Sequence, residues 1–278
     1  MHRYCALALV LIAAGPAHAA EKTFDRTFTV AAGGSLNVDA DGGTVHVSAS
    51  DANQVVVHVV FNGSEQDLAN TSVDAVQKGN DVSVTLHKKR SWSWWSFGRS
   101  DEQIEVTVPR RYAIGVRTGG GSVDLRDTGG NAFLHTSGGD VTARNVTGNV
   151  ELQTSGGSIH VDTIRGDVDA DTSGGDIQLL RVDGKIHGKT SGGSVRCSLV
   201  GANRGIWATT AGGDIELTLP KATTGNVDVS TSGGQVKSQI PVTSTQFEDK
   251  HLQGTINGGG ETIYAHTSGG SIALHAEN

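Results

Sequence analysis

Apolar and polar residues alternate in short runs along most of this chain. Such alternation predicts β-strands with one buried face, because successive side chains of a strand point to opposite sides. One short helix is predicted after Ser64, which can cap a first turn containing Glu65 and Asp67. The strands predicted in the N-terminal part begin around Phe24 and then cover residues 36–38, 45–47, 54–61, 71–77, 82–86 and 104–108.

From Thr118 onward, a strict repeat organises the pattern. Each period contains a Thr-Ser-Gly-Gly segment followed by Asp or Ser, and a second glycine-containing turn, which together predict two short strands per period. Four copies follow at intervals of 18 residues, starting at Thr136, Thr154, Thr172 and Thr190. A variant starts at Thr118, and looser copies start at Thr210, Thr231 and Thr267.

The strands of the repeat predict two apolar rows beneath a mostly polar exterior. Val141 and Ala143 belong to one apolar row, and Val150 and Leu152 belong to the opposing one. One of the outward rows contains Phe133, Glu151, Asp169 and His187. A single coil cannot bury its apolar face, but stacked coils share one continuous core. The sequence therefore predicts an all-β protein, with a single-stack β-solenoid at residues 117–278 after a strand-rich capping region at residues 20–116.

The glycine pairs and the threonines predict how each coil turns its corner. We expect the glycines to adopt a positive φ, which other residues avoid. We expect the threonines to point inward and their hydroxyls to hydrogen-bond to one another along the stack.

Composition supports this fold, and the N-terminal residues indicate a cellular location. Glycine accounts for 39 of 278 residues but proline for only 4, which fits neither collagen nor a disordered Pro/Gly tract. Residues 1–19 have the basic start, short apolar run and Ala17-His18-Ala19 cleavage site of a secretory signal peptide, so we expect an exported protein of the periplasm or cell surface. The balance of 22 basic and 29 acidic residues argues against nucleic acid as a partner.

The aspartates after the glycine pairs, Asp140, Asp176 and Asp214, are candidates for chemistry within the repeat. A column of calcium ligands is disfavoured, because serine takes this position in alternate coils. A glycosidase pair is also disfavoured, because alternate coils place the carboxylates ~9.6 Å apart and no long loops build a cleft over them. We expect these aspartates to hydrogen-bond to the backbone of their own turns.

Other reactive side chains give no clear site. His135, His160 and His187 fall at different positions of their repeats, so stacking does not gather them around a metal. Cys197 lies in an inward row and is the only cysteine after residue 19, which predicts a small buried side chain and no internal disulfide. The sequence thus predicts no catalytic residue, no metal site and no cofactor.

One segment between two predicted strands departs from the pattern. Residues 88–99 contain three of the four tryptophans, flanked by basic residues. The tryptophans could cover the open end of the solenoid. Alternatively, the segment could contact anionic lipid head groups or stack on sugar rings of the cell wall. The predicted surface contact consists of Lys88, Lys89, Arg90, Trp92, Trp94, Trp95, Phe97 and Arg99.

The segment FTVAAGGSLNVDADGGTVHVSAS, followed by TSGGDV-type coils, resembles the bacterial "putative adhesin" family of envelope proteins of unknown function. The likeness extends from about Phe28 to Leu274. It implies a glycine-rich β-solenoid that is exported or membrane-associated, without established catalytic residues.

Three hypotheses for the function remain open. The first is a non-enzymatic envelope protein that presents an elongated surface for adhesion or scaffolding. The second is an envelope-stress or membrane-sensing accessory protein that contacts lipid through residues 88–99. The third is a polysaccharide-active β-helix enzyme, which a grooved cluster of carboxylates on one flank would favour. The expected partners are accordingly a membrane surface, a cell-wall glycan or another envelope protein.

Overall fold

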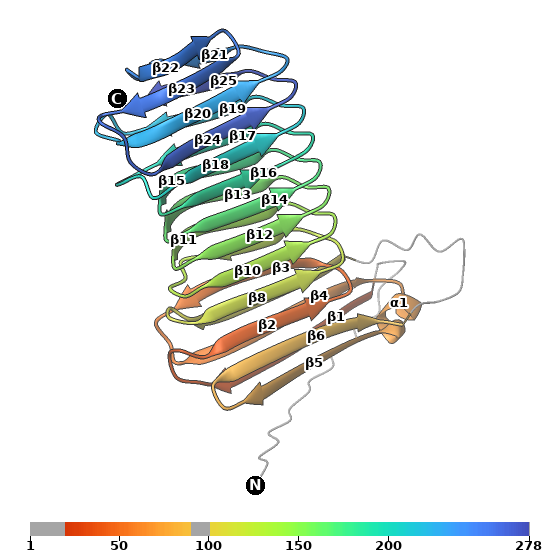
Figure 1. Ribbon diagram of the computed structural model, residues 1–278. Coiled ribbons are helices and arrows are strands. Elements are labelled where there is room, and N and C mark those ends of the chain that lie inside the picture. The colour runs from red at the N-terminus through yellow and green to blue at the C-terminus, as the bar shows by residue number, and fades with distance from the viewer. Residues whose placement is uncertain (1–19, 90–100, 278) are drawn as a thin grey trace.

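The computed structural model describes residues 20–89 and 101–277, which form two long β-sheets that face each other. Among these residues, sheet A contains 12 strands and sheet B contains 13. The strands lie side by side along one axis, with the N-terminal strands at one end and the C-terminal strands at the other (Figure 1). One apolar core extends between the sheets from Val30 to Leu274. The predicted all-β, solenoid-like architecture is therefore confirmed.

Each regular coil contributes one strand to each sheet and pairs in parallel with the coils before and after it. Thr136 pairs with Thr154 and Thr154 with Thr172, so 18 residues make one complete coil. The strands of this part are β8 (Ala113–Thr118), β9 (Val123–Arg126), β10 (Ala132–Thr136), β11 (Val141–Thr147), β12 (Val150–Thr154), β13 (Ile159–Arg165), β14 (Val168–Thr172), β15 (Ile177–Asp183), β16 (Ile186–Lys189), β17 (Val195–Leu199), β18 (Ile206–Thr210) and β19 (Ile215–Leu219).

The alternation along these strands separates core from surface as predicted. Val141 and Ala143 of sheet A and Val150 and Leu152 of sheet B are buried, whereas Glu151 between the last two is exposed. Because the coils stack in register, each inward position continues the row of the coil below it.

Antiparallel strands close the N-terminal end of the stack. A first coil, β2 and β3, pairs on one side with β8 and β9 and on the other with β6 and β7. Beyond these, β5 extends sheet B, while β4 and β1 extend sheet A. The elements are β1 (Ala20–Thr29), β2 (Ser35–Ala40), β3 (Thr44–Ser50), β4 (Gln54–Gly63), α1 (Glu65–Asn70), β5 (Thr71–Lys78), β6 (Asp81–Lys88) and β7 (Asp101–Pro109).

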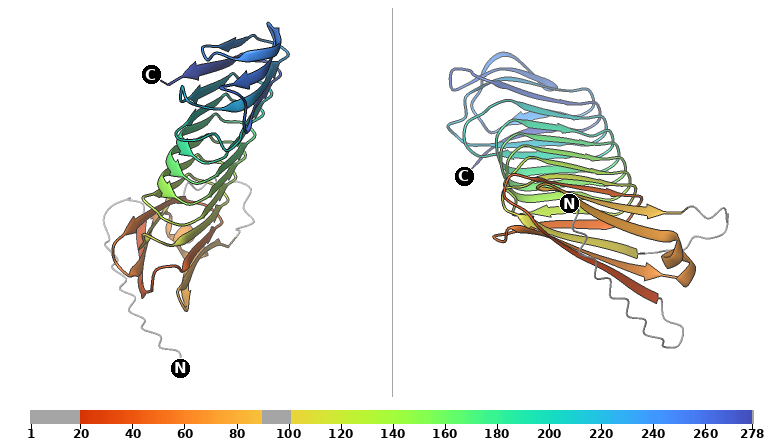
Figure 2. Two further views of the ribbon diagram at one scale, coloured as in Figure 1. Left: turned by 60° about the vertical axis from the view of Figure 1, so that its left-hand side comes forward. Right: turned by 90° about the horizontal axis from the view of Figure 1, so that it is seen from below.

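The short helix predicted after Ser64 is confirmed, and so is its cap. The hydroxyl of Ser64 accepts a hydrogen bond from the backbone N–H of Asp67 at 3.2 Å, and the Asp67 carboxylate accepts one from the N–H of Ser64 at 3.3 Å. This reciprocal pair satisfies two N–H groups that the first turn leaves unpaired. Seen from below the stack, α1 lies to one side of the N-terminal end (Figure 2).

The last strands of the chain do not lie at the end of the stack. The C-terminal elements are β20 (Gly225–Thr231), β21 (Val236–Ser238), β22 (Thr243–Glu248), β23 (His251–Ile256), β24 (Thr262–Thr267) and β25 (Ile272–Ala276). β24 pairs with β18 on one side and β20 on the other, and β25 lies between β19 and β21. The chain therefore leaves a gap after β19, turns back through the antiparallel β22–β23 pair, and fills the gap with its final coil.

The corner glycines are required for a different reason from the one expected. The second glycine of each Thr-Ser-Gly-Gly corner, such as Gly139 or Gly157, lacks the left-handed φ that would favour glycine. Its backbone instead lies directly against the corner of the preceding coil. A Cβ on Gly157 would lie 2.0 Å from the carbonyl oxygen of Gly139. The prediction of a positive φ at these positions is wrong, and close backbone approach is the physical reason for glycine here.

The corner threonines are buried as predicted, but they do not hydrogen-bond to one another. The hydroxyl of Thr154 donates to the carbonyl oxygen of Gly139 one coil earlier at 2.8 Å, and that of Thr172 donates to Gly157 at 2.8 Å. The same contact recurs at other corners of the stack. Each threonine thus connects its own corner to the backbone of the preceding coil, which satisfies a carbonyl group inside the stack.

The aspartates after the glycine pairs also connect neighbouring coils. The Asp140 carboxylate accepts a hydrogen bond from the N–H of Ser158 at 2.8 Å, and the hydroxyl of Ser158 accepts one from the N–H of Asp176 at 3.2 Å. The expectation that these aspartates bond to their own turns is therefore wrong. Asp and Ser can alternate in this row because each provides an oxygen acceptor for the next coil.

A second position, four residues after the first residue of the sheet A strand, has left-handed backbone in four successive coils. Asp127, Asn145, Thr163 and Arg181 occupy this position in successive coils, with φ between 54° and 60°. Asp and Asn tolerate this conformation, whereas a β-branched residue such as threonine is strained there.

Replacing Thr163 by asparagine is therefore expected to stabilise the protein by about 1 kcal/mol, because the side chain no longer opposes the left-handed backbone. Thermal unfolding should show the gain as a rise of roughly 2–4 °C. Thr142→Asn, in extended backbone on the outer face of the preceding coil, is the control and should give no gain. A lower melting temperature for Thr163→Asn would contradict the argument.

Candidate binding face on the 13-stranded sheet

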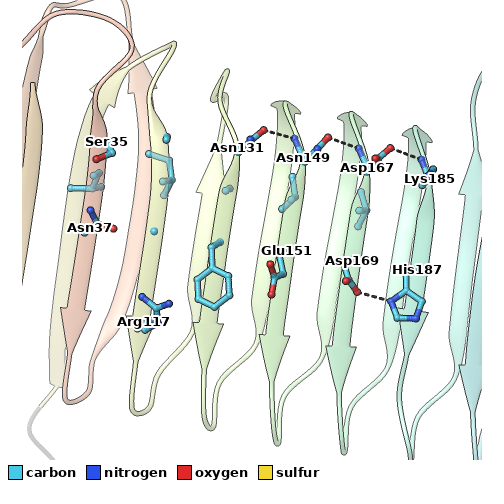
Figure 3. Close-up of a pocket in the computed structure, with 18 residues that line it drawn as sticks. Ser35, Asn37, Arg117, Asn131, Asn149, Glu151, Asp167, Asp169, Lys185 and His187 are labelled. Atoms are coloured by element: carbon cyan, nitrogen blue, oxygen red, sulfur yellow. Dashed lines mark hydrogen bonds and ion pairs between the residues drawn. The ribbon is translucent and has the colours of Figure 1, made fainter.

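A shallow groove of about 690 Å³ extends across the outer face of sheet B, over strands β2, β8, β10, β12, β14 and β16. Backbone and apolar side-chain atoms form part of its floor. Its polar lining residues are Ser35, Asn37, Arg117, Asn131, Asn149, Glu151, Asp167, Asp169, Lys185 and His187 (Figure 3).

One side of the groove is a ladder of side chains that join successive coils (Figure 3). The Asn131 side-chain oxygen accepts from the N–H of Asn149 at 3.0 Å, and the Asn149 oxygen accepts from the N–H of Asp167 at 3.0 Å. The Asp167 carboxylate accepts from the N–H of Lys185 at 2.9 Å. Because every step is fixed to the backbone, this side of the groove is held in place before any ligand arrives.

A straight line of outward side chains lies beside this ladder. Register pairs Phe133 with Glu151, Glu151 with Asp169, and Asp169 with His187. The same register then pairs His187 with Trp207, and Trp207 with Tyr264. We call this line the sheet B row; it consists of Phe133, Glu151, Asp169, His187, Trp207 and Tyr264. Neighbouring members are one strand spacing apart, about 4.8 Å.

The polar members of the row are paired but remain open to solvent. The His187 Nδ1 lies 2.6 Å from the Asp169 carboxylate, and their side chains are 47% and 58% exposed. The Glu151 carboxylate accepts a hydrogen bond from Gln153 on the same strand at 2.9 Å. Both carboxylates therefore keep oxygen atoms that a ligand can reach.

Aromatic side chains stand at both ends of the row. The Arg117 guanidinium lies 4.6 Å from the centre of the Phe133 ring, which is cation–π geometry. Trp207 is 42% exposed and is one of two large apolar residues with such exposure in the described part of the chain. A Cβ on Gly205 would lie 2.9 Å from the Trp207 ring, so the glycine leaves room for the indole.

The sequence pattern identified only part of this row. Phe133, Glu151, Asp169 and His187 follow the 18-residue period, so their common position was predicted. Trp207 follows His187 by 20 residues, and Tyr264 follows Trp207 by 57, because the final coil fills a gap in the stack. In the sequence, an aromatic residue directly follows each of the inward-facing residues Ile206 and Ile263, which indicates that both aromatic side chains point outward. The strand pairing of the tertiary structure decides which coils they lie beside.

The model of the Toastrack DUF4097 family matches residues 34–275 of this chain. The chain belongs to the Toastrack DUF4097 family. A sequence comparison with curated proteins finds no match.

Solved structures similar to this Toastrack chain include a putative adhesin from Bacteroides fragilis NCTC 9343, 14% identical with a TM-score of 0.49 over 92% of this chain and 97% of that chain. A putative adhesin from Parabacteroides distasonis ATCC 8503 is 14% identical with a TM-score of 0.45, over 91% and 97% of the two chains. A putative lipid binding protein from the same strain is 10% identical with a TM-score of 0.45, over 91% and 96%.

Only two residues of the surface contact predicted at residues 88–99 belong to the described part of the Toastrack chain. Lys88 ends β6, and Lys89 follows it. The Lys88 ammonium lies 2.7 Å from each carboxylate oxygen of Glu102, a side chain only 2% exposed. Lys88 thus neutralises a buried carboxylate. The remaining predicted contact residues lie outside the described residues: Arg90, Trp92, Trp94, Trp95, Phe97 and Arg99.

The strands that flank this segment belong to different sheets of the Toastrack fold. β6 belongs to sheet B and β7 to sheet A, and they pair in parallel with β2 and β3. In the neighbouring coil, the three residues Asp41-Gly42-Gly43 join the corresponding strands β2 and β3.

The outer face of sheet A differs from that of sheet B. A smaller hollow of about 200 Å³ is lined there by residues that include Gln178, Arg196 and Glu216. Arg196 and Glu216 are 2.6 Å apart, and this hydrogen bond holds the pKa of the Glu216 carboxyl below its usual value. Asp176 and Asp214 also line this hollow, which therefore carries more acidic than basic groups, and no aromatic residue lines it.

Three further features bear on function: possible metal ligands, the cysteine and membrane-spanning helices. Within residues 20–89 and 101–277, no three or more His, Cys, Asp or Glu side chains are arranged to hold a metal ion. Cys197 is buried as predicted, and burial raises its thiol pKa to about 12. In the same described ranges, no helix has the length and hydropathy needed to span a bilayer.

Proposed function

We propose that this protein is a non-enzymatic scaffold of the bacterial envelope that binds its partner across the outer face of sheet B. The observation that carries this proposal is the sheet B row, in which the exposed Trp207, two half-buried aromatic side chains and exposed hydrogen-bonding groups share one straight line. Large exposed apolar side chains on a protein surface mark contact sites when they lie together with other binding groups. The export expected from residues 1–19 supports the envelope as the place of action.

The construction of the fold supports a scaffold. Hydrogen bonds from corner threonines and from the Asn and Asp ladder connect each coil to the next. A surface built in this way loses little conformational freedom on binding, which favours affinity without local rearrangement.

The polysaccharide-active enzyme is the closest competing interpretation, because the groove does carry carboxylates on one flank. Glu151 and Asp169 are neighbours across strands about 4.8 Å apart, near the roughly 5–5.5 Å of retaining glycosidases. An acid catalyst, however, needs surroundings that keep it protonated. Both carboxylates are exposed, and Asp169 is paired with His187. These surroundings favour binding over hydrolysis.

The alternative of lipid contact through residues 88–99 remains a prediction. It rests on Lys89 and on residues outside the described ranges, since the Lys88 ammonium is engaged by Glu102. Co-sedimentation with anionic liposomes, using a variant with Trp92, Trp94 and Trp95 changed to alanine, tests it. Unchanged liposome binding by this variant would remove the hypothesis.

Charge reversal on the row should abolish binding to the envelope partner. We expect Glu151→Lys with Asp169→Lys to lower retention on an envelope fraction at least about tenfold, because a misplaced charge in a contact costs more than about 1.4 kcal/mol. The measurement is co-sedimentation of the purified protein with peptidoglycan sacculi, with lipid vesicles and with immobilised envelope proteins.

The control carries two lysines on the opposite face of the protein, Thr142→Lys with Gln178→Lys. It should keep the binding of the unmodified protein. Equal losses for both double variants, or retention on none of the three fractions, would refute sheet B as the contact face.

A further inference from the structure

We infer that the ligand of the sheet B row is an extended glycan chain, uncharged or containing amino sugars, lying across the strands with about one sugar ring per coil. This inference rests on the proposed function, since it assumes that sheet B is the binding face. It adds the chemical class of the ligand and its direction.

The spacing of the row matches such a chain. Successive members are one strand spacing apart, about 4.8 Å, which is close to the length that each pyranose adds to an extended β-linked glycan. The parallel register is unbroken from Phe133 to Tyr264. Consecutive sugar rings would therefore meet equivalent positions on consecutive coils.

The side chains of the row supply both contacts that sugars require. The exposed Trp207 and the half-buried Tyr264 offer aromatic surface on which the C–H face of a pyranose can pack, whereas the Arg117 guanidinium lies over the Phe133 ring. Glu151 and Asp169 offer carboxylate oxygens as strong acceptors for sugar hydroxyls. The aromatic rings stand at the ends of the row and the acceptors at its centre, so a chain of several sugars would engage both.

The charges and the backbone of this face disfavour other polymers. The row contains two carboxylates and no Lys or Arg. In the surrounding groove, Arg117 and Lys185 are outnumbered by Glu151, Asp167 and Asp169, so this face lacks the net positive charge that nucleic acids and anionic lipids need. A peptide adding as a strand needs a free sheet edge. Strands β10, β12, β14, β16, β18 and β24 all pair on both sides. A polyuronate would be repelled by the same carboxylates.

The test is isothermal titration of the purified protein with chitohexaose and with cellohexaose. We expect at least one of them to bind, and to bind more tightly than its disaccharide because more coils take part. Trp207→Ala and Tyr264→Ala should each weaken binding at least about fivefold, through loss of a stacking surface. An oligogalacturonate of the same length should not bind.

Val76→Ala is the matched control, because Val76 is 53% exposed on β5 at the far edge of the same sheet. It should bind like the unmodified protein. An equal loss in Val76→Ala, or unchanged binding in both aromatic variants, would overturn the assignment to the row. Circular dichroism and melting temperature of each variant exclude loss of fold as the cause.

The outcome separates this inference from the proposed function. If charge reversal at Glu151 and Asp169 abolishes envelope binding but neither hexasaccharide binds or competes, the glycan inference is wrong and the sheet B proposal stands. If sheet B variants leave envelope binding intact, both are wrong. New reducing ends after long incubation would support the glycan and refute the non-enzymatic part of the proposed function.

Discussion

Replacing Gly175 by valine is expected to lower the free energy of unfolding by several kcal/mol, more than the roughly 1–3 kcal/mol of ordinary overpacking. A Cβ at this position would lie 2.2 Å from the carbonyl oxygen and 2.5 Å from the carbonyl carbon of Gly157 in the preceding coil. These are backbone atoms, which cannot rotate away as a side chain can. The two coils would have to separate, and the hydrogen bond from Thr190 to Gly175 lies at the same corner.

Gly138→Val is the matched control for this prediction. Gly138 is the first glycine of its corner, and a Cβ there would meet no atom within 4 Å. Chemical denaturation of the two variants should therefore separate them clearly, with Gly138→Val close to the unmodified protein. Equal midpoints would show that close approach of the corners does not determine the need for glycine.

Replacing Lys88 by methionine is expected to cost about 2–4 kcal/mol. Removing one partner of a buried ion pair costs about 3–5 kcal/mol, and the partial exposure of Lys88 reduces that range. The Glu102 side chain is only 2% exposed, and the Lys88 ammonium is 2.7 Å from both of its carboxylate oxygens. Without the Lys88 ammonium, no opposite charge would stabilise the buried Glu102 carboxylate. The measurement is the free energy of unfolding from urea denaturation.

Two further variants test the cause of this loss. Lys89→Met changes the neighbouring lysine, whose residue is exposed, and should alter stability by less than about 0.5 kcal/mol. Adding Glu102→Gln to Lys88→Met removes the buried charge and should restore part of the lost stability. If Lys88→Met and Lys89→Met changed the free energy of unfolding by the same small amount, Lys88 would be a surface lysine, as the surface-contact prediction assumed.

Local sequence patterns were sufficient to predict the strands and the 18-residue coil. Alternation at Val141 and Ala143 assigns a buried face, and the 18-residue interval brings Thr136, Thr154 and Thr172 into one column. Both signals are local and are repeated in every coil, so errors in one copy do not shift the others. The cap at Ser64 was also predictable, because a capping box involves residues only three apart.

The roles of individual corner residues were less predictable. Sequence reasoning assigned Gly139 to a turn conformation and Asp140 to its own turn, since both explanations involve neighbours in the chain. The actual partners, Gly121 for Gly139 and Ser158 for Asp140, are 18 residues away. A repeat can reveal that a residue type is required at a position without revealing which coil requires it.

The candidate site shows the same division. The central acceptors Glu151 and Asp169 and the neighbouring His187 share the period and were assigned to one outward row. Trp207 joined that row only through the pairing of β16 with β18, and Tyr264 through the pairing of β18 with β24. Loops of different length interrupt the 18-residue period between these residues. The composition of such loops does not indicate which distant strands they bring together.

By itself, the sequence determined an all-β chain with 18-residue coils, two opposed apolar faces, buried corner threonines and one capped helix. These features depend on side-chain periodicity, which each strand expresses independently of its neighbours. Only the tertiary structure decided that the final coil fills a gap between β18–β19 and β20–β21, that Lys88 compensates Glu102, and that an aromatic and acidic line crosses sheet B. These features depend on which coils become neighbours in space, and backbone pairing between strands determines that order.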